Sequence, residues 1–243
     1  MNAEQSTETW QIEFNGQTVD TNFEQITSMI DQGELLRMDR VRKGDLRWIE
    51  AGKIGDVLHA RMTVRTSGTA GFDGEEPFLL ARQPYLYQFK RFAIFEVFIH
   101  QLDVMRTLLG PLQVISCEIA QVNNKLAGED LALITMKGRG GLTAVLDGNT
   151  SAPGYAPLPQ DRFEIIGTQD TLIYDADKLY LASDKEAPLH YDLVANYQRC
   201  WSGCVQDFAQ GLRTGAPFQT DRLDNIETLK LMETAYLAAG VKI

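Results

Sequence analysis

The chain has 243 residues, 44% of them hydrophobic, which is enough to bury the core of one large domain or two smaller ones. Lys and Arg number 23 against 33 Asp and Glu, and the resulting charge of −10 argues against nucleic-acid binding and against docking on an anionic membrane. No apolar run approaches the roughly 18 residues of a membrane helix, and no secretory signal is visible. Three cysteines cannot all form disulfides with one another, which favours a reducing compartment. A cytoplasmic protein is therefore expected.

The first 52 residues predict a polar tail followed by a small module. Residues 1–8 are polar, and we expect them to be disordered. Residues 9–52 combine strand, turn and helix signals with two tryptophans, which predicts a small α+β module. Its expected elements are a strand at Trp10–Phe14, a turn at Asn15-Gly16, a capped helix from Asn22 to Ile30 that Gly33 ends, and an extended piece from Val41 to Trp48.

Residues 53–243 predict a second, larger unit of the α+β class. Alternation over Val57–Thr66 indicates a half-buried strand, and Arg91–Leu109 predicts a long helix. Six strand-like runs follow, at Val114–Val122, Leu131–Met136, Leu142–Leu146, Phe163–Gly167, Thr171–Tyr174 and Leu179–Ala182. Two helices come last, at Leu193–Leu212 and about Leu223–Ala239. This order predicts an open mixed or antiparallel sheet that helices cover on one face.

A polar stripe on the helix at 91–109 is the first candidate for chemistry. Glu96, His100, Asp103 and Thr107 follow one another at i, i+4, i+7 and i+11 and fall within roughly 60° of arc. The remaining residues are apolar almost all round, so we expect a buried helix whose stripe faces a wet cleft. His100 is the residue type best suited to proton transfer near neutral pH, and Glu96 could orient it. Alternatively, Glu96 and His100 form an i,i+4 pair, and Asp103 pairs with Arg106.

Five segments carry a resemblance to a known family. They are GKIGDVLHARMTVRTSG (52–68), FLLARQPYLYQFKRFAIFEVFIHQLDVMRTLLG (78–110), AGED (127–130), FEIIGTQDTLIYD (163–175) and FAQGLRTGAPFQTDRLDNIETLKLMETAYLAAG (208–240). In this order they resemble the substrate domain of the Gfo/Idh/MocA oxidoreductases. The resemblance runs from about residue 52 to the end, which makes 53–243 the counterpart of that family's C-terminal substrate and dimerisation domain.

The resemblance implies an activity and a set of site residues. It implies an NAD- or NADP-dependent dehydrogenase of a sugar, cyclitol or other polyol, with a homodimer as the expected assembly. His100 occupies the position of the family's catalytic acid/base, and Glu96 that of the acidic residue before it. The substrate-binding positions that the resemblance implies are Arg82, Tyr85, Asp103 and Asn149.

The nucleotide half of such an enzyme is not recognisable in the sequence. A dinucleotide site needs G-x-G-x-x-G between a strand and a helix. The glycines at 68, 71 and 74 and those at 138, 140 and 141 have neither that spacing nor that setting, so they predict turns. The family's Glu-Lys-Pro segment is missing, and only about 50 residues precede the matching region. We therefore expect no complete NAD(P) site in this chain and no identifiable cofactor-binding residue. A separate chain could supply the Rossmann domain, or the chain could be a fragment without it.

The module at 9–52 resembles a bacterial GYF-like domain. The likeness lies in Trp10, Asn15-Gly16-Gln17, the helix that ends at Gly33, and Arg47-Trp48. It implies a surface that takes proline-rich or extended peptides. Alternatively, both tryptophans anchor a small core. The alternative to an enzyme is therefore a non-catalytic ligand-binding or dimerisation module, or a vestigial fragment, whose N-terminal unit recruits a peptide.

The remaining cysteines and histidines predict no metal site. Cys200 and Cys204 lie at i,i+4 on a helix, but zinc needs three or four ligands, so core or interface positions are expected. Cys117 falls in an alternating strand and predicts a core residue. His59 and His190 predict surface or hydrogen-bonded positions.

Overall fold

The computed structural model describes residues 10–14, 17–21, 25–26, 28–29, 40–43, 49–50, 53–70, 76–158, 160–215 and 222–241. The chain forms two compact units. One comprises residues 1–57 with 167–170, and the other comprises 58–166 with 171–243. The predicted boundary at residue 52 lies outside the described residues, and each unit is considered by itself.

The first unit holds a four-stranded sheet in the order β2-β1-β3-β4. Its strands are β1 (Trp10–Phe14), β2 (Gln17–Thr21), β3 (Arg40–Lys43) and β4 (Ile49–Glu50). All described pairings are antiparallel. Phe14 pairs with Gln17, so β1 and β2 form a hairpin where the sequence predicts a turn after one strand, and Ile12 of β1 is buried.

The predicted helix of this unit is described only in part. Gln25, Ile26, Ser28 and Met29 are helical, whereas the rest of Asn22–Ile30 lies outside the described residues. The same holds for Asn15-Gly16, Gly33 and Trp48, which the GYF-like resemblance uses. That resemblance and the peptide binding it implies stay predictions.

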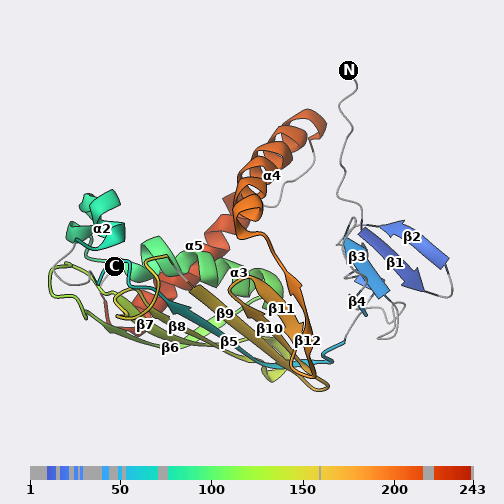
Figure 1. The fold of residues 1–243 in the computed structure, drawn as a ribbon, viewed down its shortest axis with the longest axis horizontal. Coiled ribbons are helices and arrows are strands. Elements are labelled where there is room, and N and C mark those ends of the chain that lie inside the picture. Colours follow the sequence, from blue (N-terminus) through green and yellow to red (C-terminus); the bar gives the residue numbers. More distant parts are fainter. Residues whose placement is uncertain are drawn as a thin grey trace. The chain divides into compact units, whose positions relative to one another are not determined.

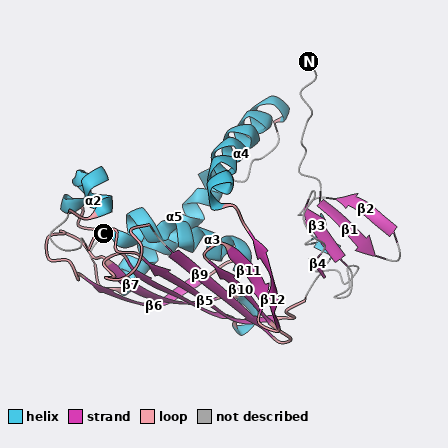
Figure 2. Cartoon of the chain, in the orientation of Figure 1, coloured by secondary structure: helices cyan, strands magenta, loops and turns pink. Residues whose placement is uncertain are grey.

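The second unit is built on an eight-stranded mixed sheet in the order β12-β11-β10-β9-β5-β8-β7-β6 (Figure 2). Its strands are β5 (Val57–Arg65), β6 (Gln113–Ala120), β7 (Leu131–Lys137), β8 (Thr143–Asn149), β9 (Gln160–Gly167), β10 (Thr171–Asp175), β11 (Lys178–Leu181) and β12 (Asp184–His190). β5 and β8 pair in parallel, and the β6–β7, β7–β8, β9–β10, β10–β11 and β11–β12 pairs are antiparallel. The predicted mixed sheet is confirmed.

Helices lie on one face of this sheet. They are α2 (Phe78–Arg82), a 3-10 turn (Pro84–Gln88), a π-helix (Ala93–Phe98), α3 (Ile99–Leu109), α4 (Leu193–Thr214) and α5 (Arg222–Ala238). Figure 1 shows α3 and α5 running across the same face, as predicted for the α+β class. Across the described ranges, no helix is long and apolar enough to cross a membrane.

The core lies between these helices and the central strands. Alternate residues of β5, β7 and β8 are buried on the helix side, which is the period-2 pattern that the sequence shows. Gly148 of β8 faces the ring of Phe98, and a methyl group on Gly148 would overlap that ring. Glycine at this position therefore allows the π-helix to approach the sheet closely.

The prediction of one α-helix over Arg91–Leu109, buried except along its polar stripe, is wrong in two respects. Its first part, Ala93–Phe98, is a π-helix, whose i→i+5 hydrogen bonds widen the turn. Its surface is also only partly covered, since Phe95, Val104 and Leu108 are 42%, 43% and 59% exposed. The roughly 60° arc predicted for the polar stripe assumed a regular α-helix. Glu96 lies in the π-helix, so this arc does not hold for Glu96.

Several elements were absent from the predicted set, and two of them, α2 and β12, lie in the second unit. Helix α2 has only five residues, too few to show a helical period. Strand β12 contains Pro188 and several charged residues, which argue against a central strand. The structure places β12 at the edge of the sheet, where a proline is tolerated because one side of the strand needs no partner.

A buried carboxylate fastens the start of the π-helix to the rest of the unit. Glu129 is 5% exposed, and its Oε1 accepts hydrogen bonds from the backbone N–H of Phe92 at 3.2 Å and of Ile94 at 3.0 Å. Its other oxygen accepts from Phe92 at 3.1 Å. Carboxylates are favoured at this end of a helix, where N–H groups lack intrahelical partners.

The same carboxylate reaches the last helix. The hydroxyl of Tyr236 on α5, fully buried, donates to Glu129 Oε1 at 2.6 Å. Arg91 lies over the Tyr236 ring at 4.2 Å from its centroid and pairs with Glu233 at 2.6 Å. Burial, then the hydrogen bond to Glu129, raises the pKa of Tyr236, so the phenol stays a donor at all ordinary pH values.

We predict that Glu129→Ala lowers the free energy of unfolding by about 3 kcal/mol, because two backbone N–H groups and one hydroxyl lose their acceptor inside the protein. Tyr236→Phe removes one hydrogen bond only and should cost about 1 kcal/mol. Urea unfolding followed by circular dichroism measures both. Equal stabilities of the two variants would contradict the central role given to Glu129.

Candidate functional site

A cavity of about 500 Å³ lies between one side of α3 and the strands β5, β9, β10 and β11. Its walls are mostly apolar and come from Met62, Val104, Leu108, Phe163, Ile165, Leu172 and Leu179. Four polar side chains also line it, namely His100, Gln101, Asp161 and Tyr174. An apolar cavity with a few convergent polar groups has the usual composition of a small-molecule site.

Asp161 and Gln101 are held together at the polar end. Gln101 Nε2 donates to Asp161 Oδ2 at 3.0 Å. The other oxygen of each side chain, Asp161 Oδ1 and Gln101 Oε1, is buried without a hydrogen-bond partner. Burial raises the pKa of Asp161, while the Gln101 hydrogen bond and the charge of His100 lower it. The carboxyl group therefore holds a proton to higher pH than an exposed aspartate does.

Tyr174 extends this polar end toward a second, smaller cavity. That cavity measures about 280 Å³ and shares Asp161 and Tyr174 with the first, while Leu193 at the start of α4 lines it from another side. Burial, then the negative charge of Asp161, raises the pKa of Tyr174. The hydroxyl of Tyr174 is therefore a neutral donor at neutral pH.

His100 is exposed at the edge of the larger cavity, where it interacts electrostatically with Asp161. Within the described residues, neither the predicted i,i+4 hydrogen bond between Glu96 and His100 nor another ion pair of Glu96 is formed. The orienting role of Glu96 stays a prediction. An imidazole beside a half-buried carboxyl group can take up or release a proton at a ligand in this cavity.

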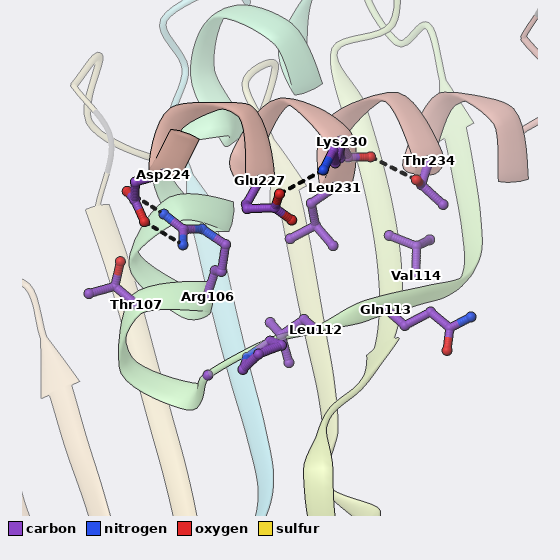
Figure 3. A pocket seen from close by; sticks show the side chains of 12 residues that line it. Arg106, Thr107, Leu112, Gln113, Val114, Asp224, Glu227, Lys230, Leu231 and Thr234 are labelled. Carbon is purple, nitrogen blue, oxygen red and sulfur yellow. Dashed lines mark hydrogen bonds and ion pairs between the residues drawn. The ribbon is translucent and has the colours of Figure 1, made fainter. Parts of the chain in front are cut away.

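Of the other stripe members, Thr107 lines a different cavity, of about 450 Å³, at the far end of α3 (Figure 3). Arg106 donates to both oxygens of Asp224 on α5, at 2.8 and 2.7 Å, and to Asp103 at 2.9 Å. The hydroxyl of Thr228 donates to Asp103 at 2.5 Å. The alternative pairing of Asp103 with Arg106 is thus confirmed, and it joins α3 to α5.

The hydrogen bond to Asp224 is the main reason why the pKa of Arg106 is raised, so this cation is permanent. Thr107 lines the same cavity as Arg106 and Asp224 (Figure 3). Two of the four stripe residues, His100 and Thr107, therefore line different cavities. Of the six predicted site residues, all in the described part of the chain, His100 alone lines the larger cavity.

Three predicted substrate-binding residues do not line the larger cavity, namely Arg82, Tyr85 and Asn149. Arg82 lies over the Phe78 ring at 5.2 Å, and the Tyr85 hydroxyl donates to Gln83 at 3.0 Å. Asn149 accepts a hydrogen bond from the backbone of Ser151 at 2.8 Å. It follows Gly148, which faces the π-helix, so the alternation of a strand directs Asn149 to the opposite face. The structure does not bring these three residues to His100, and their roles toward substrate stay predictions.

The described glycine turns do not fit a dinucleotide. Gly138, Gly140 and Gly141 form the connection between antiparallel β7 and β8, with positive φ at Gly140 and Gly141. No helix follows this turn to present its N-terminus to a pyrophosphate. Gly71 and Gly74 lie outside the described residues. The β7–β8 turn therefore provides no phosphate cradle, and no step involving the nicotinamide is derived from it.

Sequence reasoning missed Gln101, Asp161 and Tyr174 as site residues. Asp161 was detectable in principle, because it shares a face of β9 with Phe163 and Ile165. A carboxylate on the apolar face of a strand is costly unless it has a function or a partner. Gln101 and Tyr174 gave no comparable signal, since their positions depend on how α3 crosses β9 and β10.

The cysteines and the two other histidines occupy different settings. Cys117 is buried as predicted, and burial is the first cause that raises the pKa of its thiol to about 12. Cys200 and Cys204 are exposed on α4, so of the two predicted settings the core is wrong, and an interface position stays a prediction. His59 contacts Thr143 at 3.0 Å and His190 contacts Asp177 at 3.3 Å, as expected for hydrogen-bonded residues.

Comparisons with known proteins agree with the fold and give the family. The GFO/IDH/MocA C-terminal domain matches residues 46–173. A D-apiose dehydrogenase of Rhizobium rhizogenes is 30% identical over 210 residues, and one of Paraburkholderia graminis is 31% identical over 212 residues. Each match covers 79% of this chain, and 56% and 52% of the relatives, so the chain spans about half the length of the curated relatives it matches.

A solved structure of an oxidoreductase from Agrobacterium radiobacter, in complex with NAD+, L-tartaric acid and magnesium, is similar with a TM-score of 0.64. It is 27% identical, and the match covers 79% of this chain and 57% of that one. The resemblance predicted from the five segments is confirmed. This chain belongs to the GFO/IDH/MocA family, whose C-terminal domain it carries at residues 46–173.

Proposed function

We propose that the second unit is the substrate-binding part of a sugar or polyol dehydrogenase, and that His100 exchanges the proton of the reacting hydroxyl group. The observation that carries this proposal is the cavity beside α3, in which His100 and Asp161 face the same space. Both curated relatives are D-apiose dehydrogenases, which supports a neutral sugar as ligand.

The chemistry of the cavity suits such a ligand. Sugars combine apolar C–H faces with hydroxyl groups, and the cavity combines apolar walls with a polar end formed by Gln101, Asp161 and Tyr174. Buried polar groups that bind hydroxyls reject ligands that lack them, which is the physical basis of selectivity. Oxidation of a carbinol releases its hydroxyl proton, and His100 is placed to accept it.

The proposed nucleotide cofactor is supported by a similar structure and not by residues of this chain. An NAD-type cofactor is supported by the NAD+ in the similar Agrobacterium radiobacter structure. In this proposal the Rossmann part that binds it lies outside the described residues, on a separate chain or segment. Homodimer formation through this unit is likewise a proposal.

A second candidate is a ligand-binding module without catalysis. The cavity beside α3 can hold a small molecule by itself, which is the observation that favours it. Separate titrations with D-apiose and NADH distinguish the two. Binding of both supports a dehydrogenase in this chain, whereas binding of the sugar alone supports the module or a Rossmann-bearing partner.

We predict saturable binding of D-apiose to the purified protein, measured by isothermal titration calorimetry. Val104→Trp should abolish it, because the indole fills the cavity. His100→Ala should bind the sugar nearly as well as the unmodified chain, yet lower NAD-dependent oxidation by about 10²–10⁴-fold wherever turnover is observed.

Leu237→Trp is the matched control, because Leu237 is an exposed helical residue outside the cavity. It should bind D-apiose like the unmodified chain. The proposal fails if no sugar binds, or if Val104→Trp and Leu237→Trp bind equally well.

We also predict that Asp161→Asn raises the melting temperature at pH 7 by about 2–4 °C, which corresponds to about 1 kcal/mol in a protein of this size. Burial raises the pKa of Asp161 in the folded state, so its contribution to stability decreases as pH rises from the unfolded pKa through the folded one. Asparagine keeps the acceptor for Gln101 and carries no charge. The gain in melting temperature should therefore vanish at pH values below the pKa that Asp161 has in the unfolded chain.

Asp147→Asn serves as a control, because it should change the melting temperature at pH 7 in the opposite direction. Burial alone would raise the pKa of Asp147, but the hydrogen bonds and charges of Arg65 and Arg61 lower it overall. Its ionised form therefore stabilises the fold at pH 7, and the variant should melt earlier there. Melting curves of both variants between pH 3 and pH 7 test the assignment, and a change of the same sign in both would refute it.

A further inference from the structure

The helix wall of the larger cavity is polar at one end and apolar at the other. Along α3, the residues that line it are His100 and Gln101, then Val104, then Leu108. They share one side of the helix, because residues three or four apart lie above one another. With a rise of about 1.5 Å per residue, His100 and Leu108 are roughly 12 Å apart along the helix axis.

The sheet wall of this cavity shows the same order. Asp161, Phe163 and Ile165 are alternate residues of β9, and all three line the cavity. On the neighbouring strand β10, Tyr174 pairs with Phe163, and Leu172 pairs with Ile165 at the apolar end. At about 3.3 Å per residue, Asp161 and Ile165 lie roughly 13 Å apart along the strand. The helix wall and the sheet wall therefore agree in length and in the order of polar and apolar residues.

One hydrogen bond aligns the two walls. Gln101 Nε2 donates to Asp161 Oδ2 at 3.0 Å, so the polar ends of α3 and β9 meet. Leu108 and Ile165 line the same cavity farther along the helix and the strand. The polar and the apolar lining are thus separated along the cavity. A free sugar carries hydroxyl groups on all sides, so it matches the polar end only.

The volume of the cavity supports a ligand larger than one sugar ring. The cavity measures about 500 Å³, which is in the range of cavities that hold drug-sized ligands. A sugar ring at the polar end occupies only part of this space. Water is poorly suited to the rest, because an ordered water molecule needs two or more polar partners. The apolar end therefore suits an apolar group that is attached to the sugar.

We propose that the cavity binds a sugar or polyol that carries an apolar substituent, as an aryl or alkyl glycoside does. The hydroxyl groups lie against Gln101, Asp161 and Tyr174, and the substituent lies between the apolar residues of α3 and those of β9 and β10. This inference rests on the proposed function, in which His100 exchanges the proton of the reacting hydroxyl group. Since His100 lies at the polar end, the substituent is attached on the side of the sugar away from the reacting carbon.

The charges of the cavity favour a neutral ligand. Asp161 brings a carboxyl group to the polar end, and none of the described residues that line the cavity is Lys or Arg. A sugar acid or a sugar phosphate would place a second negative charge near Asp161 without a permanent cation beside it, which is costly away from water. A neutral glycoside avoids this cost.

Isothermal titration calorimetry with D-apiose, methyl β-D-apiofuranoside and phenyl β-D-apiofuranoside tests the proposal. The phenyl glycoside should bind more tightly than the methyl glycoside by on the order of tenfold or more, because its ring removes more apolar surface from water. Titrations at several temperatures should also give the phenyl glycoside the more negative heat-capacity change of binding, which is the marker of apolar burial.

Two matched variants locate the substituent. Leu108→Gln should reduce the ratio of the two affinities about fivefold, because it places a polar group at the apolar end. Leu108 is 59% exposed, so the fold does not depend on its burial. Leu237→Gln changes a leucine of α5 that is 57% exposed and lies outside the cavity, and it should leave the ratio unchanged. Gln101→Leu alters the polar end and should weaken both glycosides by the same factor.

The outcomes separate this inference from the proposed function. If D-apiose binds but the two glycosides bind with equal affinity, the apolar substituent is refuted and the sugar site is retained. If neither D-apiose nor the glycosides bind, both proposals are refuted. If the phenyl glycoside binds more tightly but Leu108→Gln and Leu237→Gln have the same effect on the ratio, its ring lies outside this cavity and the inference is wrong.

Discussion

The arrangement of the second unit depends on the position of one buried carboxylate. Glu129 precedes β7, accepts hydrogen bonds from the backbone at the start of the π-helix, and accepts another from Tyr236 on α5. It thereby joins three segments that lie 37 and 107 residues apart in the chain. A buried acceptor with several donors tolerates little displacement, since each unmade hydrogen bond costs about 1–3 kcal/mol. The direction of the π-helix, and of α3 after it, follows from this attachment.

That direction decides which side chains form the site. With the helix fixed at its start, His100 and Gln101 face β9, where Asp161 is located, while Asp103 and Arg106 face α5. The two sets have different physical roles. The Asp103–Arg106–Asp224 group is fully paired and joins helices, whereas Asp161 and Gln101 each keep a buried oxygen without a partner. Unmet hydrogen-bonding capacity beside a cavity is a feature of sites that await a ligand, because the ligand supplies what the fold does not.

Much of the fold was predictable because its signals are local. Alternation identified β5 and most later strands, and apolar spacing identified α4 and α5, since an apolar face gives the sequence the period of its element. The site was less accessible. His100 stood out as a histidine in an apolar helix, but Asp161, 61 residues later, meets it only through the crossing of α3 over β9. The π-helix was also missed, because a widened turn leaves no mark in the spacing of Phe92, Phe95 and Phe98. The family resemblance identified a conserved type of domain, yet it could not say which of the six residues share a cavity.

The order of strands has a consequence for how the unit assembles. β5 is the first strand of its sheet in the chain, yet its neighbours in the sheet, β8 and β9, begin only at Thr143 and Gln160. During synthesis both edges of β5 therefore stay unpaired while some eighty residues are added before β8 begins. Pairing across such a separation closes a long loop before any contact compensates, which slows folding. The β6–β7–β8 meander can form first from neighbouring segments, and it then offers the edge on which β5 docks. Until β9 has been synthesised, the two edges of β5 cannot both be paired with their native neighbours, and unpaired strand edges favour aggregation of an incomplete chain.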